Sequence, residues 1–445
     1  MFVRNSMIIN SNGNLNNNNR YNSNRTRAVS EFDSNTPLSR EDVWLAYYDC
    51  RKNIRNTESQ LEFEVNYEFE CLNLWREINS RTYKPSESTA FIVDVPCKRE
   101  VFAASFKDRV VQHIISLRLV PILESVFIDN TFNNRVGKGT LFGAKTLAAD
   151  IKRVSNDYTE DCYVAILDHS GFFMSIHKPT LCDLVDRLWD EYYHEPDKDL
   201  MKWLTRVALE DCPEEHCRIN SPRNKWEGLA PNKSLFTCGK DKGLPIGNNL
   251  SQLLANYILN DFDHYVLNEL CPDAYGRYVD DFYVVCKDKS RLLAMVPPMR
   301  EKLASRGLML HPHKFYCQHY SKGVKFVGSV IKKDRFYLSN RTINNAFHTL
   351  RTLNAEIPEP MDLLWLEHFQ GRINAYLSFM RHHNAYRIRK RFLGEIDVRL
   401  REYLYIGGDY EKVVIRKKYH RREIMRKAIA SKHKHIKIEP RKADK

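Results

Sequence analysis

The sequence predicts an α+β fold with an antiparallel sheet, and two stretches carry this prediction. Residues 274–286 hold two runs rich in aromatic and β-branched side chains on either side of Asp280 and Asp281, as in a β-hairpin. Residues 162–168 are a short apolar run ending in Asp168, which is typical of a buried strand. Most other segments with apolar side chains have them at helical spacing.

The two adjacent acids indicate a metal site. Asp280 and Asp281 at a hairpin tip repel each other, and Asp-Asp is not a favoured two-residue turn. A bound cation would offset this repulsion. Asp168, leaving the end of a strand opposite the tip, would complete a cage for two Mg²⁺ ions, which lie roughly 3.5–4 Å apart in sites that transfer phosphoryl groups.

Composition is compatible with a folded protein that binds a polyanion. The 445 residues are 43% hydrophobic and carry a formal net charge of +13. Nucleic acid is one partner that this charge favours, and a solvated basic surface is the alternative. No apolar run reaches membrane-spanning length, and no secretory signal follows Arg4, so we expect no membrane partner.

The cysteines indicate a reducing compartment. Eleven are scattered along the chain without a paired framework, so we expect them to be reduced and the protein to be cytoplasmic. A zinc site is an alternative for one group, although its spacing is not that of a zinc ribbon. That group consists of Cys212, His216, Cys217 and Cys238.

The first half of the chain offers several phosphate-binding candidates. A helix is expected to start at about Ser39, and residues 90–113 read as strand, turn, strand and helix. Lys98 and Arg99 beside this turn could clamp a triphosphate, and a salt-bridged surface hairpin is the alternative. Arg109 could act with them or pair with Asp108. Lys138 lies in a basic, glycine-containing loop ahead of a helix and is a further candidate.

The middle of the chain holds a shaped turn that leads into a helix. Residues 243–252 contain two glycines and a proline, and an apolar face then continues to about Leu270. Beside the carboxylates, this turn could hold a template base or the incoming nucleotide. Helix capping and packing are the alternative for Asn249 and Ser251.

The C-terminal third is expected to be strand, then helix, then basic tail. Residues 308–316 and 324–331 read as a strand pair, and residues 340–405 as mostly helical. Residues 412–445 are densely basic, which favours contact with RNA phosphates, with plain solvation as the alternative.

Taken in order, these motifs resemble those of reverse transcriptases over roughly residues 40–340. The resemblance implies a right-hand polymerase with fingers, a palm built on an antiparallel sheet, and a helical thumb. The expected parts are a disordered Asn-rich leader (1–37), N-terminal helices and fingers (38–150), a palm (151–335, with a finger-side insertion at about 180–242), the thumb (336–405) and a basic tail (406–445).

Residues 246–252, Ile-Gly-Asn-Asn-Leu-Ser-Gln, distinguish subgroups of the family. Most relatives have Gln-Gly and Ser-Pro at the corresponding places, whereas this pattern resembles reverse transcriptases of diversity-generating retroelements. Residues 99–104, 138–141 and 319–326 are also similar to that group. Retron enzymes fit less well because the thumb lacks Val-Thr-Gly, and no Cys/His-rich endonuclease follows as in many group II intron proteins.

The resemblance assigns roles by position. Catalytic and metal-binding residues would be Asp168, Asp280 and Asp281, with the backbone carbonyl of His169 as a further metal ligand. Nucleotide-binding residues would be Lys98, Arg99, Lys138, Phe173 (the steric gate under the sugar), Ile246, Gly247 and Lys314. Template and fidelity residues would be Ile246, Asn249, Ser251 and Gln252, and the primer grip Phe326, Val327 and Gly328. Phe172 is expected in the core.

The implied activity is RNA-templated DNA synthesis with two Mg²⁺ ions, for which Mn²⁺ can substitute. The subgroup implies error-prone copying of template adenines, with dNTPs, template RNA, a cDNA primer and a small basic helical accessory protein oligomer as partners. Two alternatives stay open. One is an antiphage-defence or other bacterial reverse transcriptase, and the other is a maturase-like RNA-binding protein with a silent polymerase core.

Overall fold

The computed structural model describes residues 8–9, 15–16, 36–53, 57–94 and 97–420. Most of the leader predicted to be disordered and residues 421–445 of the predicted basic tail lie outside these ranges. Within the leader, Ile8–Ile9 (β1) and Leu15–Asn16 (β2) pair antiparallel. The chain divides into two compact units, the first with Met1–Ile92, Arg99–Val126 and Phe173–Ile258, the second with Val93–Lys98, Phe127–Phe172 and Leu259–Lys445.

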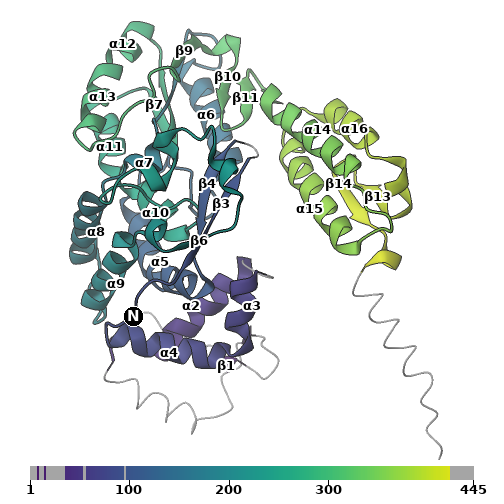
Figure 1. Ribbon diagram of the computed structural model, residues 1–445. Coiled ribbons are helices and arrows are strands. Elements are labelled where there is room, and N and C mark those ends of the chain that lie inside the picture. Colours follow the sequence, from purple (N-terminus) through teal and green to yellow (C-terminus); the bar gives the residue numbers. More distant parts are fainter. Residues whose placement is uncertain (1–7, 10–14, 17–35, 54–56, 95–96, 421–445) are drawn as a thin grey trace, which may run out of the picture. The chain divides into compact units, whose positions relative to one another are not determined.

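The first unit is mainly helical and carries a small sheet (Figure 1). Its helices are α2 (Arg40–Asn53), α3 (Glu58–Val65), α4 (Tyr67–Asn79), α5 (Phe106–Val126), α8 (Lys178–Tyr192), α9 (Lys198–Glu210) and α10 (Asn249–Tyr257). The sheet has the order β4 (Arg99–Ala103), β3 (Ser88–Val93) and β6 (Cys217–Ile219), with β6 parallel to β3. The strand, turn, strand and helix predicted for residues 90–113 are confirmed.

A buried carboxylate attaches the irregular segment after α9 to this sheet. Glu100 is 1% exposed and accepts hydrogen bonds from Trp226 Nε1 at 2.7 Å, Ser234 Oγ at 2.7 Å and the Leu235 N–H at 2.6 Å. A buried charge costs little when several donors satisfy it. Glu100 therefore orders residues that have little regular structure of their own.

The second unit is built on a four-stranded antiparallel sheet, which confirms the predicted α+β class. The strand order is β7 (Ala274–Tyr278), β8 (Asp281–Cys286), β5 (Tyr163–Asp168) and β9 (Tyr316–His319). Helix α6 (Thr140–Val154) covers one face, where Leu147 and Ile151 pack with Val164 and Tyr283. On the other face, Phe262 of α11 (Asn260–Tyr265) lies 5.5 Å from Phe282 between ring centroids. Helices α12 (Lys289–Ala294) and α13 (Val296–Ala304) follow the β7–β8 hairpin along the chain.

Two details of the predicted elements were wrong. Residues 308–316 do not pair with 324–331, because Pro312 interrupts that run and the strand that follows, β9, pairs with β5 instead. Residues 324–331 form a separate sheet, whose strands are β10 (Val324–Phe326), β11 (Ser329–Lys332) and β12 (Arg335–Leu338). The helix expected to run to Leu270 ends at Tyr257, and the chain resumes as α11 and a π-helical turn, Val266–Leu270.

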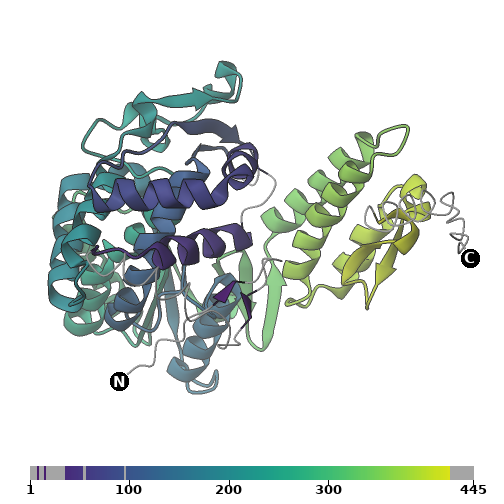
Figure 2. The same ribbon diagram turned by 90° about the horizontal axis from the view of Figure 1, so that it is seen from below.

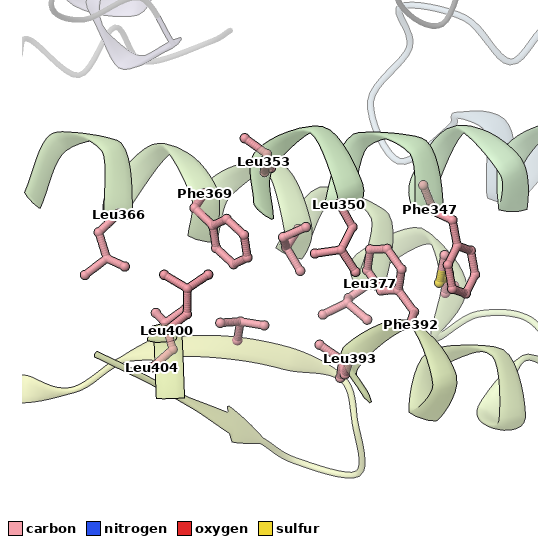
Figure 3. Close-up of a cluster of buried hydrophobic side chains, with 14 of the residues drawn as sticks. Phe347, Leu350, Leu353, Leu366, Phe369, Leu377, Phe392, Leu393, Leu400 and Leu404 are labelled. Carbon is pink, nitrogen blue, oxygen red and sulfur yellow. The ribbon is translucent and has the colours of Figure 1, made fainter. Parts of the chain in front are cut away.

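The helical segment after β12 has its own core. Its elements are α14 (Asn340–Ala355), α15 (Leu363–Met380), α16 (Tyr386–Gly394), β13 (Leu404–Gly407) and β14 (Lys412–Ile415). Figure 2 shows the two long helices side by side, and Figure 3 shows their leucine and phenylalanine side chains packed over the hairpin. Val413 and Ile415 are 1% and 5% exposed, so this core extends into residues 406–445, which were expected to be a basic tail.

Candidate active site

The sheet register brings the candidate acids together at one end of the four-stranded sheet. Asp168, the last residue of β5, is the cross-strand partner of Asp281, the first residue of β8. Tyr278 pairs with Asp281, so Val279 and Asp280 form a two-residue turn. Directly opposed residues point to the same face, with Cβ atoms roughly 4.5–5.5 Å apart. Asp168 and Asp281 therefore face the same space beside the Asp280 turn.

The charges of this cluster act on one another. Burial, followed by the charges of Asp280 and Asp168, raises the pKa of Asp281 to about 7, against an opposing effect of Lys314. The Lys314 ammonium forms an ion pair with the Asp168 carboxylate. Although burial lowers the pKa of Lys314, its hydrogen bond to Asp168 and the nearby carboxylates raise it overall. The cluster has an excess of negative charge, which a further cation would stabilise.

The donor chemistry of this cluster fits a hard divalent cation, because all its donors are carboxylate oxygens. Within the described ranges, however, no three or more His, Cys, Asp or Glu side chains are already grouped as metal ligands. Lys314 is the cation paired with Asp168. Binding a metal would thus require the carboxylates to turn toward a common point and Lys314 to release Asp168.

The zinc alternative has no support in the structure. Cys212, His216, Cys217 and Cys238 all lie within the described residues 97–420, where no such group of metal-ligating side chains is found. His216 Nε2 lies 2.8 Å from the Asp211 carboxylate, and Cys238 Sγ lies 3.1 Å from the Lys242 carbonyl. These side chains have other partners because the irregular segment folds back on itself.

The backbone of the Val279–Asp280 turn is strained, and side chains hold it. Val279 has φ +56°, a conformation that is rare for a β-branched residue and costs on the order of 1–3 kcal/mol. Arg277 Nη1 donates to the Val279 carbonyl at 3.0 Å, and His169 Nδ1 lies 2.9 Å from the Asp280 carbonyl. Sequence reasoning missed both contacts, although an arginine inside an apolar strand was a detectable signal.

Arg277 is itself held by a fully buried ion pair. Arg277 and Asp263 are both 0% exposed, and Arg277 Nε lies 2.8 and 3.0 Å from the two Asp263 oxygens. The Tyr275 hydroxyl donates to the same carboxylate at 2.6 Å. Burial lowers the pKa of Arg277, but the Asp263 carboxylate raises it by more than burial lowers it. The pKa is therefore raised overall, and the guanidinium stays ionised.

The first unit brings two other candidate residues to one small apolar cluster. Phe173 and Ile246 are half-buried and pack against Ala90, Phe102, Met174 and Leu235. The Leu244 N–H donates to the Phe173 carbonyl at 3.0 Å, and the Phe102 N–H donates to the Ile246 carbonyl at 2.9 Å. The shaped turn is thereby tied both to Phe173 and to strand β4. Phe172 is 3% exposed, as expected for a core residue.

Gly247 is required by both its conformation and its surroundings. Its φ is +120°, and a Cβ there would lie 2.9 Å from Val101 Cγ1 and 3.1 Å from the Phe102 carbonyl oxygen. We expect Gly247→Ala to lower the free energy of unfolding by roughly 1–3 kcal/mol, measured by urea denaturation. Gly371→Ala is the control, because Gly371 lies in helix α15 and a Cβ added there would have no atom within 4 Å. Alanine at this position should stabilise the helix slightly. Equal effects of the two variants would contradict this account.

Asn249 and Gln252 lie on a small polar pocket together with two residues that the sequence did not single out, Gln112 and His113. The pocket is about 170 Å³ and is lined by Arg109, Gln112, His113, Gly247, Asn249 and Gln252. Arg109 does not pair with Asp108, whose carboxylate bonds Tyr83, Ser86 and Ser105. Ser251 is 5% exposed and packs inward, which favours the packing alternative for that residue.

The remaining candidates occupy varied positions. Lys98 precedes β4 and is half-buried, Arg99 is the exposed first residue of β4, and Lys138 Nζ donates to the Asp129 carbonyl at 2.5 Å. Val327 and Gly328 form the turn between β10 and β11, with φ of +41° and +84°. Phe326 is 3% exposed and packs edge-on against Tyr283, so only the turn residues of the predicted primer grip are accessible.

Residues 98–331, just over half of the chain, match the family model described as "Reverse transcriptase (RNA-dependent DNA polymerase)". The chain belongs to the reverse transcriptase family. Its right-hand polymerase fold, expected from the sequence motifs, is that of this family. The matched range includes the shaped turn and all three acids of the palm. Reverse transcriptase domains generally use divalent metal ions, which agrees with the oxygen donors found here.

Solved telomerase structures are similar to this reverse transcriptase at low identity. Apo telomerase from Candida tropicalis aligns at 12% identity with a TM-score of 0.43, covering 70% of this chain and 59% of that one. The form truncated from its C-terminal domain gives 12% identity and a TM-score of 0.39, covering 57% and 55%. The chain thus spans less than two-thirds of either telomerase chain. No curated protein matches the sequence.

Within the described residues, no helix combines the length and apolarity that crossing a bilayer requires.

Proposed function

We propose that this reverse transcriptase is an active RNA-directed DNA polymerase that adds deoxynucleotides to a 3′-hydroxyl on an RNA template. The observation that carries the proposal is the register of the palm sheet, which pairs Asp168 with Asp281 beside the Asp280 turn. A catalytically silent maturase-like protein would not need to keep three mutually repelling carboxylates near one another. Primer extension with RNA template, DNA primer, dNTPs and Mg²⁺ tests it: extension supports the proposal, and none with any divalent metal refutes it.

Asp168, Asp280 and Asp281 would hold two Mg²⁺ ions, with Mn²⁺ as a substitute and the His169 carbonyl as a further ligand. When bound, such ions neutralise charge on the phosphates and lower the pKa of the attacking hydroxyl. The His169 carbonyl suits this role because its antiparallel bridge to Leu310 does not use it. The two hydrogen bonds of the bridge are made by the neighbours of His169, the Asp168 carbonyl and the Ser170 N–H.

Lys314 and the finger residues would handle the triphosphate. Lys314 is already ion-paired with Asp168 and would neutralise or protonate the departing pyrophosphate. Lys98, Arg99 and Lys138 would neutralise the phosphates, because ammonium and guanidinium groups compensate their charge without taking part in bond changes. Phe173 would exclude a 2′-hydroxyl, and Val327 and Gly328 would contact the primer end.

We further propose that the enzyme copies its template with errors at adenines, in the cytoplasm, as part of a diversity-generating retroelement. The support is Ile246, an apolar residue packed with Phe173 in one cluster. Isoleucine cannot hydrogen-bond a nucleotide, so this position offers no polar contact that would distinguish a matched pair from a mismatched one. A small basic helical accessory protein and a structured template RNA would be the partners. An antiphage-defence enzyme is the competing assignment, and a template repeat beside the gene would exclude it.

The fidelity proposal predicts that Ile246→Gln lowers misincorporation opposite template adenine. One added hydrogen bond contributes about 0.5–1.5 kcal/mol, which corresponds to roughly a 2- to 10-fold change. The measurement is sequencing of cDNA made on an adenine-containing template. Ile246→Leu is the control, because leucine keeps the apolar volume and should leave the error rate unchanged. An unaltered rate in the glutamine variant would remove this explanation.

A further inference from the structure

The His169 side chain lies behind the acid cluster, where its ring contacts the backbone of the Asp280 turn. Successive residues of a strand point to opposite faces, so Asp168 faces the cluster while His169 faces the other side of the sheet. There its ring centroid lies 5.3 Å from that of Phe172, 5.5 Å from that of Phe282 and 6.4 Å from that of Phe262. His169 is 3% exposed in this aromatic surrounding.

Only one polar contact of this imidazole is made within the described part of the chain. Its Nδ1 lies 2.9 Å from the Asp280 carbonyl, whereas its Nε2 is buried without a hydrogen-bond partner there. A carbonyl only accepts, so the imidazole carries its proton on Nδ1 and donates it. Packing alone would favour an apolar residue at this place, because a buried polar group with one unmet bond destabilises the fold.

The hydrogen bond connects the two segments that carry the acids. Asp168 and His169 are consecutive, and the backbone around them is held by the His311 N–H donating to the Asp168 carbonyl at 2.7 Å. Any displacement of the Asp280 peptide relative to β5 must therefore break or stretch the bond to His169. Arg277 holds the other carbonyl of the turn, that of Val279, from the β7 side.

We propose that His169 is a positioning residue, whose Nδ1–H sets the Asp280 and Asp281 carboxylates relative to Asp168 for metal binding. This inference rests on the proposed polymerase function and deepens it. Groups that orient metal ligands typically change metal affinity by about 10- to 100-fold when they are removed. The role belongs to the side chain and is separate from that of the His169 carbonyl.

The test compares side chains of matched shape with and without the donor. His169→Asn keeps an N–H near the position of Nδ1, His169→Leu matches asparagine in shape without a donor, and His169→Phe keeps the ring without a donor. Metal affinity is read without substrate, from Mn²⁺ binding by electron paramagnetic resonance and from the Mg²⁺-dependent rise in melting temperature. The Mg²⁺ requirement for primer extension is read in parallel.

We expect His169→Leu and His169→Phe to weaken metal binding at least about tenfold, and His169→Asn to stay within about threefold of the native protein. Native metal affinity in either donor-free variant that folds would overturn the inference, and so would equal losses in the asparagine and leucine variants. If neither donor-free variant folds while His169→Asn binds metal weakly, the inference also fails. A native protein that binds metal but never extends a primer would instead refute the proposed function.

Discussion

Replacement of Asp281 by asparagine is expected to reduce dNTP incorporation by on the order of 10³-fold or more, while RNA binding stays within a few-fold. Catalysis of phosphoryl transfer depends on positioning and charge neutralisation, so losing Asp281 as one of the proposed metal ligands would remove most of the transition-state stabilisation. Template RNA, in contrast, would be held mainly through contacts to its many phosphates, which do not depend on one carboxylate. Asp280→Ala is expected to behave in the same way.

This prediction separates catalysis from folding. Asp281 is surrounded by the like charges of Asp280 and Asp168, so removing its charge relieves repulsion and should not lower stability. Asp161→Asn is a matched control, because Asp161 lies just before β5 with a side chain that is 79% exposed. The assay is single-turnover primer extension alongside RNA binding. Extension by Asp281→Asn at more than a tenth of the native rate would show that the acids have another role.

Breaking the Arg277–Asp263 pair is expected to give the largest loss of stability in the palm. Arg277→Met leaves the Asp263 carboxylate fully buried with the Tyr275 hydroxyl and no cation, which typically costs about 3–5 kcal/mol. It also frees the Val279 carbonyl, so polymerase activity should fall with it. Urea denaturation measures the free energy of unfolding.

A double-mutant cycle isolates the ion pair from general packing damage. The double variant Arg277→Met/Asp263→Leu has no unpaired charge. Its loss of unfolding free energy should therefore be smaller than the sum of the losses in the two single variants, by at least about 1 kcal/mol. Additive losses would mean that the two side chains contribute only volume. Tyr275→Phe should cost less than either, because the ion pair remains intact.

The strands and the turn of the palm could be predicted, because each is determined by residues that are neighbours in the sequence. Alternation along residues 274–286 indicates strands, and two acids between two such runs mark the turn. The register observed for Asp168 and Asp281 agrees with the predicted approach of residues 162–168 to the hairpin. The same reasoning erred at residues 308–316, where an apolar run next to Pro312 suggested a strand pair that the fold does not make.

The contacts that hold the turn could not be predicted, because each joins positions that no local pattern relates. Arg277 and Asp263 are 14 residues apart, in a strand and a helix, while His169 and Asp280 are 111 residues apart. At best, Arg277 inside an apolar strand indicated that an anion would be buried nearby. The pocket that adds Arg109 and Gln112 to Asn249 and Gln252 likewise depends on the packing of α5 against α10.

The central claim, that Asp168 joins Asp280 and Asp281 at one divalent-metal site, can be tested by iron-directed cleavage of the chain. Fe²⁺ replaces Mg²⁺ at such sites and, with ascorbate and peroxide, generates radicals that cut the nearest backbone. Cuts are expected next to Asp168 and at Asp280–Asp281, and excess Mg²⁺ or the Asp281→Asn substitution should weaken them. Cuts confined to one of the two segments, or located elsewhere, would contradict it.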